Sequence, residues 1–143
     1  MQKEGVHIEN QEQNLILKEL KTYKLPVKSL SEYDNLTQKE KIIFLAGVFD
    51  GEGCFGLWSK IKKQRYLACS VETTDRDMVK RFHDMYGGAF YLVNKRQAHH
   101  KDSWRWKIWG KGALKSLEEM ISYMCKRRQE KFKNVVERIK ISN

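Results

Sequence analysis

Two carboxylates stand close together in the segment FLAGVFDGEGCF, residues 44–55, which otherwise contains only apolar residues and glycines. Carboxylate oxygens are ligands that Mg²⁺ prefers, and a bound divalent metal can activate water for hydrolysis. Asp50 and Glu52 are two residues apart, so a helix points them about 200° away from each other. We expect Glu52, at the end of such a helix, to face a groove over a neighbouring sheet, and Asp50 to face back along the helix.

The remaining metal-binding residue types do not form a recognisable site. The pair His99-His100 has no further His or Cys at ligand spacing, so a solvated loop is the better interpretation. Cys54, Cys69 and Cys125 are odd in number and widely spaced, which favours reduced thiols packed as small apolar residues. A single carboxylate such as Glu52 is itself more often a surface group than a ligand, so its neighbours must decide its role.

A capping box predicts where the helix that carries the two acids begins. Thr37 is followed three residues later by Glu40, ahead of an apolar run, and this pattern is typical of a helix start. We expect a helix over about 38–51. The spacing i, i+3, i+7 then gives it a core face, which consists of Ile42, Leu45 and Phe49.

Glycines inside this helix need a separate explanation. Gly47 and Gly51 are four residues apart, and each costs about 1 kcal/mol relative to alanine within a helix. Small residues at this spacing let two helices approach closely, which is the compensation that we expect. The alternative, that Gly51 and Gly53 only terminate the helix, does not account for Gly47. The second face of the helix would comprise Ile43, Ala46, Gly47, Asp50 and Gly51.

The sequence pattern changes after the motif helix from a helical period to alternation. Apolar side chains at Phe55, Leu57, Leu67, Cys69 and Val71 predict a hairpin that turns near residues 62–64. Further along, we expect a helix over 76–86 that ends at Gly87-Gly88, strands over 89–95 and 103–109, and helices from about Ala113 and Arg128. The order αββαββαα indicates an α+β domain.

Composition points to a polyanionic partner. The chain has 143 residues, with 28 Lys and Arg against 18 Asp and Glu, for a formal net charge of +10. Nucleic acid is the first candidate for such a surface, and an anionic membrane surface is the second. The longest apolar run, Ile42–Phe49, is too short to cross a bilayer, and the first ten residues do not resemble a signal peptide. We therefore expect a protein of the cytoplasm or of a DNA-containing organelle compartment, neither secreted nor membrane-bound.

The N-terminal residues 1–36 differ in composition from the rest of the chain. They are polar apart from LILKEL at Leu15–Leu20, and they contain the only proline, Pro26. We expect an extension made of a short helix and an irregular arm, followed by a domain over residues 37–143.

The segment Leu45–Gly53, LAGVFDGEG, resembles the motif of the LAGLIDADG homing endonucleases, with Glu52 in place of the final Asp. The resemblance extends over about Thr37–Ile139 and includes the order of elements. It implies the α+β fold of that family, an αββαββα core whose antiparallel DNA-binding sheet carries helices on one face. Because the motif occurs once, the resemblance also implies a homodimer whose two motif helices pack at the twofold axis, through Ile43, Ala46, Gly47, Asp50 and Gly51.

The same resemblance implies a set of catalytic residues. Glu52, helped by the Gly51 carbonyl, would bind Mg²⁺ or Mn²⁺ beside the scissile phosphate, while Ca²⁺ would support binding without cleavage. Lys126, with Arg128 as the second candidate, would order water near the nucleophile or leaving group. A polar residue that ends the second strand would complete the site, with Thr73 first and Thr74 or Asp75 as alternatives.

The implied function is that of an intron-encoded enzyme of a mobile genetic element. Such an endonuclease hydrolyses both strands of double-stranded DNA at a long pseudo-palindromic site. The face of the sheet opposite the helices would bind DNA, whereas Trp104, Trp106 and Ile108 would lie under the helices. The DNA-binding candidates are Trp58, Lys60, Lys62, Lys63, Arg65, Tyr66, Ser70, Tyr91, Asn94, Lys95, Arg96, Arg105 and Lys107. Two alternatives remain open: an RNA maturase that aids intron splicing, and a non-catalytic DNA-binding regulator on the same fold.

Overall fold

The computed structural model describes residues 2–22, 32–59, 65–95 and 97–142 of the chain. They fall into two units, Met1–Asn35 and Leu36–Asn143. The first unit contains the helix α1, Gln2–Thr22, which is longer than the short helix predicted around Leu15–Leu20. The irregular arm predicted after it falls largely on residues 23–31, outside the described residues. No helix among the described residues is long and apolar enough to span a membrane.

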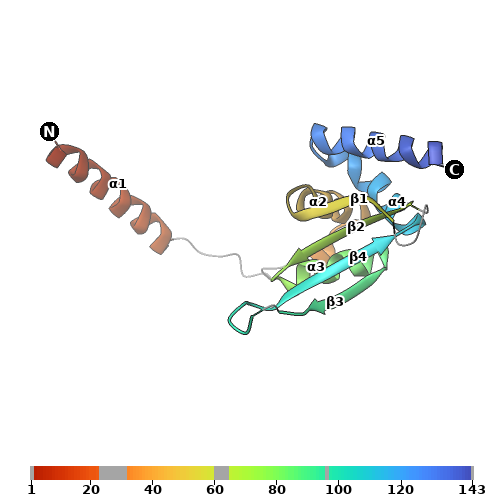
Figure 1. The fold of residues 1–143 in the computed structure, drawn as a ribbon. Coiled ribbons are helices and arrows are strands. Elements are labelled where there is room, and N and C mark those ends of the chain that lie inside the picture. The colour runs from red at the N-terminus through yellow and green to blue at the C-terminus, as the bar shows by residue number, and fades with distance from the viewer. Residues whose placement is uncertain (1, 23–31, 60–64, 96, 143) are drawn as a thin grey trace. The chain divides into compact units, whose positions relative to one another are not determined.

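The second unit has the predicted order of elements (Figure 1). This unit contains the short 3₁₀ turn η2 (Ile121–Tyr123), whereas the 3₁₀ turn η1 (Tyr33–Asn35) belongs to the first unit. The helices and strands of the second unit are α2 (Gln38–Glu52), β1 (Gly53–Ser59), β2 (Arg65–Thr73), α3 (Arg76–Tyr86), β3 (Ala89–Val93), β4 (Ser103–Trp109), α4 (Lys111–Met120) and α5 (Lys126–Ser142). The last two helices begin two residues earlier than predicted. The hairpin turn predicted near residues 62–64 lies outside the described residues.

The four strands form one antiparallel sheet in the order β1-β2-β4-β3. Phe55 pairs with Cys69, and Val71 pairs with Trp106, so their side chains share one face. These four side chains are buried in the core together with apolar residues of α2, α3 and α4. The prediction that the β4 tryptophans lie under the helices is confirmed for Trp106, which is fully buried. Among the described residues of this unit, no helix covers the opposite face of the sheet.

The predicted capping box fixes the start of α2. The Glu40 amide donates to Thr37 Oγ1 at 3.2 Å, and the Thr37 amide donates to Glu40 Oε1 at 3.0 Å. These hydrogen bonds with Thr37 lower the pKa of Glu40 because they favour its charged form.

At its other end, α2 passes directly into β1 at Gly53. A β-carbon at Gly53 would overlap the Phe49 ring and lie 2.6 Å from the Phe49 carbonyl oxygen. Glycine is therefore required here, and Glu52 is held at the junction of helix and sheet.

Candidate active site and nucleic-acid surface

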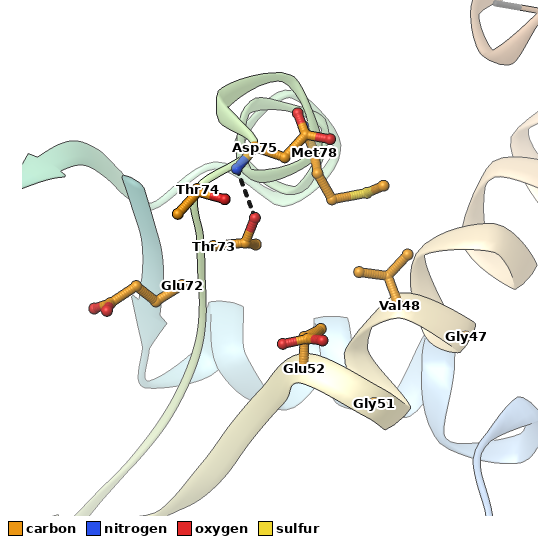
Figure 2. A pocket seen from close by; sticks show the side chains of 9 residues that line it. All are labelled: Gly47, Val48, Gly51, Glu52, Glu72, Thr73, Thr74, Asp75 and Met78. Atoms are coloured by element: carbon orange, nitrogen blue, oxygen red, sulfur yellow. Dashed lines mark hydrogen bonds between the residues drawn. The ribbon is translucent and has the colours of Figure 1, made fainter. Parts of the chain in front are cut away.

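Glu52 opens onto a groove between the end of α2 and the turn from β2 to α3. The groove has a volume of about 630 Å³, and Figure 2 shows Glu52 and Thr73 on opposite sides of it. The Glu52 side chain is exposed, as the sequence predicted for the acid at the helix end. The groove is lined by Gly47, Val48, Gly51, Glu52, Glu72, Thr73, Thr74, Asp75 and Met78.

The turn opposite Glu52 is held by its own polar side chains. Thr73 Oγ1 accepts the Asp75 amide hydrogen at 2.7 Å, and Asp75 Oδ1 accepts the Met78 amide hydrogen at 3.3 Å. Asp75 is thus the N-cap of α3, a role that uses one oxygen of its carboxylate. The Thr73 hydroxyl accepts a bond from the turn and keeps its own hydrogen to donate. Of the three candidates at this strand end, Thr73 is therefore the best placed to act in the groove.

A second, smaller groove of about 320 Å³ continues from Glu52 onto the open face of the sheet. It is lined by Glu52, Cys54, Ser70, Glu72, Arg105 and Lys107. Glu72 lines both grooves, although sequence reasoning did not select it. The signal that could have found it is the register, which places Glu72 opposite Arg105 on adjacent strands.

Glu72 and Arg105 form an ion pair across the two strands. Arg105 Nε donates to Glu72 Oε1 at 2.9 Å, Nη2 makes a closer contact with the same oxygen, and Nη1 donates to Tyr91 Oη at 3.4 Å. The hydrogen bond with Tyr91, followed by the interaction with Glu72, raises the pKa of Arg105. The pair compensates the Glu72 charge and fixes the orientation of the guanidinium group on the sheet.

The groove chemistry suits a divalent cation but is incomplete in one chain. Glu52 supplies a carboxylate, and the Gly51 carbonyl belongs to the last turn of α2, where carbonyls lack helical partners. Within the described parts of the chain, no three His, Cys, Asp or Glu side chains gather to hold a metal, and exposed His99 and His100 are no exception. A hard cation takes about six oxygen ligands, so the others must come from water, a phosphate or a second protein molecule.

Arg128 makes contacts that hold the end of α2 within its own chain. Its Nη2 donates to the carbonyl oxygens of Asp50 at 3.3 Å and Gly53 at 2.8 Å, on either side of Glu52 in the sequence. The guanidinium side chain is only 13% exposed. It therefore ties the start of α5 to the end of α2, and its catalytic role stays a prediction.

Asp50 also faces its own chain, where the sequence had placed it at the dimer interface. Asp50 Oδ2 accepts the Cys125 amide hydrogen at 3.1 Å, and Oδ1 lies 4.0 Å from Arg128 Nε. The Asp50 carboxylate thus accepts a hydrogen bond from the backbone just before α5 and faces the largely buried Arg128 side chain. Asp50 is corrected from an interface residue to one that docks α5 on α2.

The interface face of α2 needs a second correction. Ala46 is fully buried within its own chain and has no surface to offer a partner. Gly47 and Gly51 are exposed, and a β-carbon at either would meet nothing within 4 Å. Ile43 is 41% exposed beside them, and so is Phe44 at 37%, which the sequence did not select. The Arg81 guanidinium lies 5.4 Å from the centre of the Phe44 ring, so we call Ile43, Gly47 and Gly51 alone the bare face of α2.

Lys126 begins α5 and is exposed, next to the contacts that dock this helix on α2. The turn before it is closed by Gln129, whose Nε2 donates to the carbonyls of Ile121 at 3.2 Å and Met124 at 3.1 Å. These contacts hold the turn that precedes α5. The role of Lys126 itself stays a prediction.

The sheet face opposite the core carries many of the predicted DNA-binding residues. The register places six of them on this face: Trp58, Tyr66, Ser70, Tyr91, Arg105 and Lys107. Trp109 shares it and was missed. Arg65 is adjacent to Tyr66 in the same strand, so it points to the helix side, which corrects its assignment. Asn94 and Lys95 are exposed just beyond β3, while Lys60, Lys62, Lys63 and Arg96 lie outside the described residues.

No protein-family model matches this chain, and no curated protein sequence matches it. Among solved structures, the homing endonuclease I-CvuI in complex with its target aligns at a TM-score of 0.50 and 17% identity, over 64% of this chain and 61% of that one. The group I intron-encoded homing endonuclease I-CeuI complexed with DNA aligns at a TM-score of 0.48 and 13% identity, over 89% and 69%. The match therefore spans less than two thirds of the I-CvuI chain, and it shows a shared fold.

Proposed function

We propose that this chain, which has the fold of the LAGLIDADG homing endonucleases, is a homodimeric, metal-dependent endonuclease that cuts both strands of a specific DNA site. One observation carries the proposal: the bare face of α2 lies beside Glu52 at the end of the same helix. The carboxylate proposed to take part in hydrolysis therefore lies next to a surface suited to contact a second copy of the chain. We expect the protein to act in the cellular compartment that contains its DNA target.

A homodimer would explain why α2 keeps glycines that lower the stability of the helix. Gly47 and Gly51 relieve no clash in the single chain, and Gly47, in the interior of α2, weakens the helix by about 1 kcal/mol. Packing against a second α2 offsets this cost, because Gly47 and Gly51 let two backbones approach. A twofold axis along this face places both Glu52 side chains near the axis, one for each DNA strand.

The chemistry follows from the donors around the groove. Glu52 and the Gly51 carbonyl would hold Mg²⁺ or Mn²⁺ against a DNA phosphate, and the metal would supply Lewis-acid stabilisation of charge on the reacting oxygens. The Thr73 hydroxyl can donate a hydrogen bond to water in the groove, and Lys126 can place positive charge near the leaving group. We expect Ca²⁺ to allow binding without cleavage.

Recognition of the site belongs to the open face of the sheet. A two-stranded ribbon fits the major groove of DNA, where Lys and Arg contact phosphates and guanine edges. Arg105 is pre-oriented for such a contact by Glu72 and Tyr91. The twofold repeat of this surface predicts a pseudo-palindromic site.

Glu52→Gln tests the proposal because it preserves shape and removes the charge that holds the metal. Target duplexes are first selected from a randomised library by wild-type binding in Ca²⁺. We expect Glu52→Gln to bind them within about 3-fold of the wild type and to cut them at least about 100-fold more slowly in Mg²⁺. Glu118→Gln, an exposed carboxylate on α4, is the matched control and should cut normally.

Two results would overturn the proposal. Cleavage by Glu52→Gln at the wild-type rate removes Glu52 from the active site. A wild-type protein that binds the selected duplexes but cuts none of them in Mg²⁺ or Mn²⁺ points instead to a maturase or a regulator.

A further inference from the structure

Glu72 is unexpected on a surface that is proposed to bind DNA. Its register with Arg105 places it on the open face of the sheet, where its carboxylate would face the phosphates of a bound duplex. Among the described residues of the four strands, Glu72 is the only acidic side chain on this face. A carboxylate in this position repels DNA, so recognition of a duplex does not by itself explain it.

Glu72 also borders the groove that contains the candidate catalytic acid. Glu52 and Glu72 line both the groove beside α2 and the smaller groove on the sheet. Figure 2 shows the Glu72 side chain turned away from Glu52. This side chain is 41% exposed, so it can change rotamer without disturbing the core. Glu72 therefore has access to the groove but does not use it in the observed conformation.

The Arg105 guanidinium keeps Glu72 in this conformation. Its Nε donates to Glu72 Oε1 at 2.9 Å, and Nη2 contacts the same oxygen. The contacts of the described residues use Oε1 alone, so Oε2 keeps its capacity to accept. Exposed ion pairs contribute little to stability, so this pair can be exchanged for another interaction at low cost.

A DNA phosphate would compete with Glu72 for Arg105. Carboxylate and phosphate are both anionic acceptors that fit the fork of a guanidinium group. If a phosphate takes this place, Glu72 loses its cation while further negative charge lies close to Glu52. A divalent cation between the two carboxylates would offset this charge, and its preferred ligands are carboxylate oxygens. Contact of DNA with Arg105 and binding of metal at Glu72 should therefore favour each other.

We propose that Arg105 holds Glu72 out of the metal site in the DNA-free protein, and that contact of DNA with Arg105 releases Glu72 to become a second carboxylate ligand beside Glu52. This inference rests on the proposed function and goes beyond it, because it makes the metal affinity of the groove depend on bound DNA. The groove gains its full negative charge only when the substrate is in place.

The test titrates the DNA-free full chain with Mn²⁺ and follows the electron paramagnetic resonance signal of unbound Mn²⁺. Arg105→Met removes the cation that holds Glu72 and should raise the Mn²⁺ affinity by at least about 5-fold. Arg105→Met combined with Glu72→Gln should show no such rise. Lys107→Met is the matched control, because Lys107 lines the same groove whereas the ion pair joins Glu72 to Arg105. It should raise the Mn²⁺ affinity by less than about 2-fold, since exposed charges are screened.

Duplex binding supplies the reciprocal measurement. Ca²⁺ should tighten binding of a selected duplex by the wild type, and Glu72→Gln should reduce this gain by at least about 3-fold. Equal Mn²⁺ affinities of Arg105→Met and the double variant overturn the proposal, and so does an unchanged effect of Ca²⁺ in Glu72→Gln.

Glu52→Gln separates this inference from the proposed function. If Glu52→Gln weakens Mn²⁺ binding while the Glu72 variants behave as their parents do, only the role of Glu72 fails. If Glu52→Gln also leaves the Mn²⁺ affinity unchanged, the metal site at Glu52 fails as well.

Discussion

The two sides of α2 differ in whether the rest of the chain covers them. On one side Leu45, Ala46 and Phe49 are fully buried in the core of their own chain. On the other side Gly47 and Gly51 face open space, where an added β-carbon would meet nothing within 4 Å. The folded chain explains the first side completely and leaves the second unexplained, so the second side indicates a partner.

The glycines of the motif show the same contrast at single positions. Gly53 is required by its own chain, because any side chain there would collide with Phe49. Gly47 and Gly51 are required by nothing within the chain. Glycine is therefore present in this short segment for two different reasons, and only the atoms around each position distinguish them.

Phe49→Ala should have the largest effect on stability. The Phe49 ring is fully buried and lies 6.1 Å from the Phe55 ring and 6.3 Å from the Phe82 ring, measured between centroids. We expect the free energy of unfolding to fall by about 3–5 kcal/mol in urea titrations. Phe44→Ala, at a position of α2 that is 37% exposed, is the matched control and should cost less than half as much. Equal losses would contradict the division of α2 into two sides.

Gly47→Leu should break assembly while sparing the single chain. A β-carbon at Gly47 would meet nothing within 4 Å, so we expect the monomer to accept leucine, whereas two facing helices would be held apart. We expect dimerisation, measured by sedimentation, to weaken by at least about 100-fold, or about 2.7 kcal/mol, and double-strand cleavage to be lost with it. Unfolding of the monomer should change by less than about 1 kcal/mol. A wild-type monomer that cuts both strands would refute the role given to the bare face.

Arg128→Met should have an intermediate effect, because it tests the contacts between α2 and α5. The variant leaves two carbonyl oxygens near Glu52 without their donor and Asp50 without its cation. We expect the free energy of unfolding to fall by about 1–3 kcal/mol, with slower cleavage as Glu52 loses its support. The neighbouring Arg127 is exposed, and Arg127→Met should leave both quantities within error. Full stability with lost cleavage would instead return Arg128 to the chemistry.

Gly47→Ala should give the smallest effect, and Gly53→Ala should give an effect of the opposite sign. Alanine at Gly47 meets no atom and favours the helix, so the monomer should gain about 0.5–1 kcal/mol. Alanine at Gly53 would overlap Phe49 and should cost about 1–3 kcal/mol. Thermal unfolding at low protein concentration measures both. Destabilisation by Gly47→Ala under those conditions would show that the glycine serves the single chain.

Local signals in the sequence determined most of the fold. The capping box of Thr37 and Glu40, the alternation in the strands, and Gly87 after α3 each act over a few residues. Gly87 has φ of 76°, a conformation that glycine adopts without strain, and it ends the helix as expected. Such features can be predicted because the atoms that cause them are neighbours in the chain. Glu52 at the end of its helix follows from the same local rules.

Only the tertiary structure decided which residues around Glu52 act on substrate and which hold the fold. Because α2 is apolar on nearly every side, its pattern of residues did not determine which side faces the core. Ala46 and Asp50 were therefore assigned to the wrong side. Arg128 reaches carbonyls 75 and 78 residues away, and Glu72 meets Arg105 across 33 residues. Periodicity specifies which residues share a face of one element, but not which element that face will meet, because that depends on the packing of the whole domain.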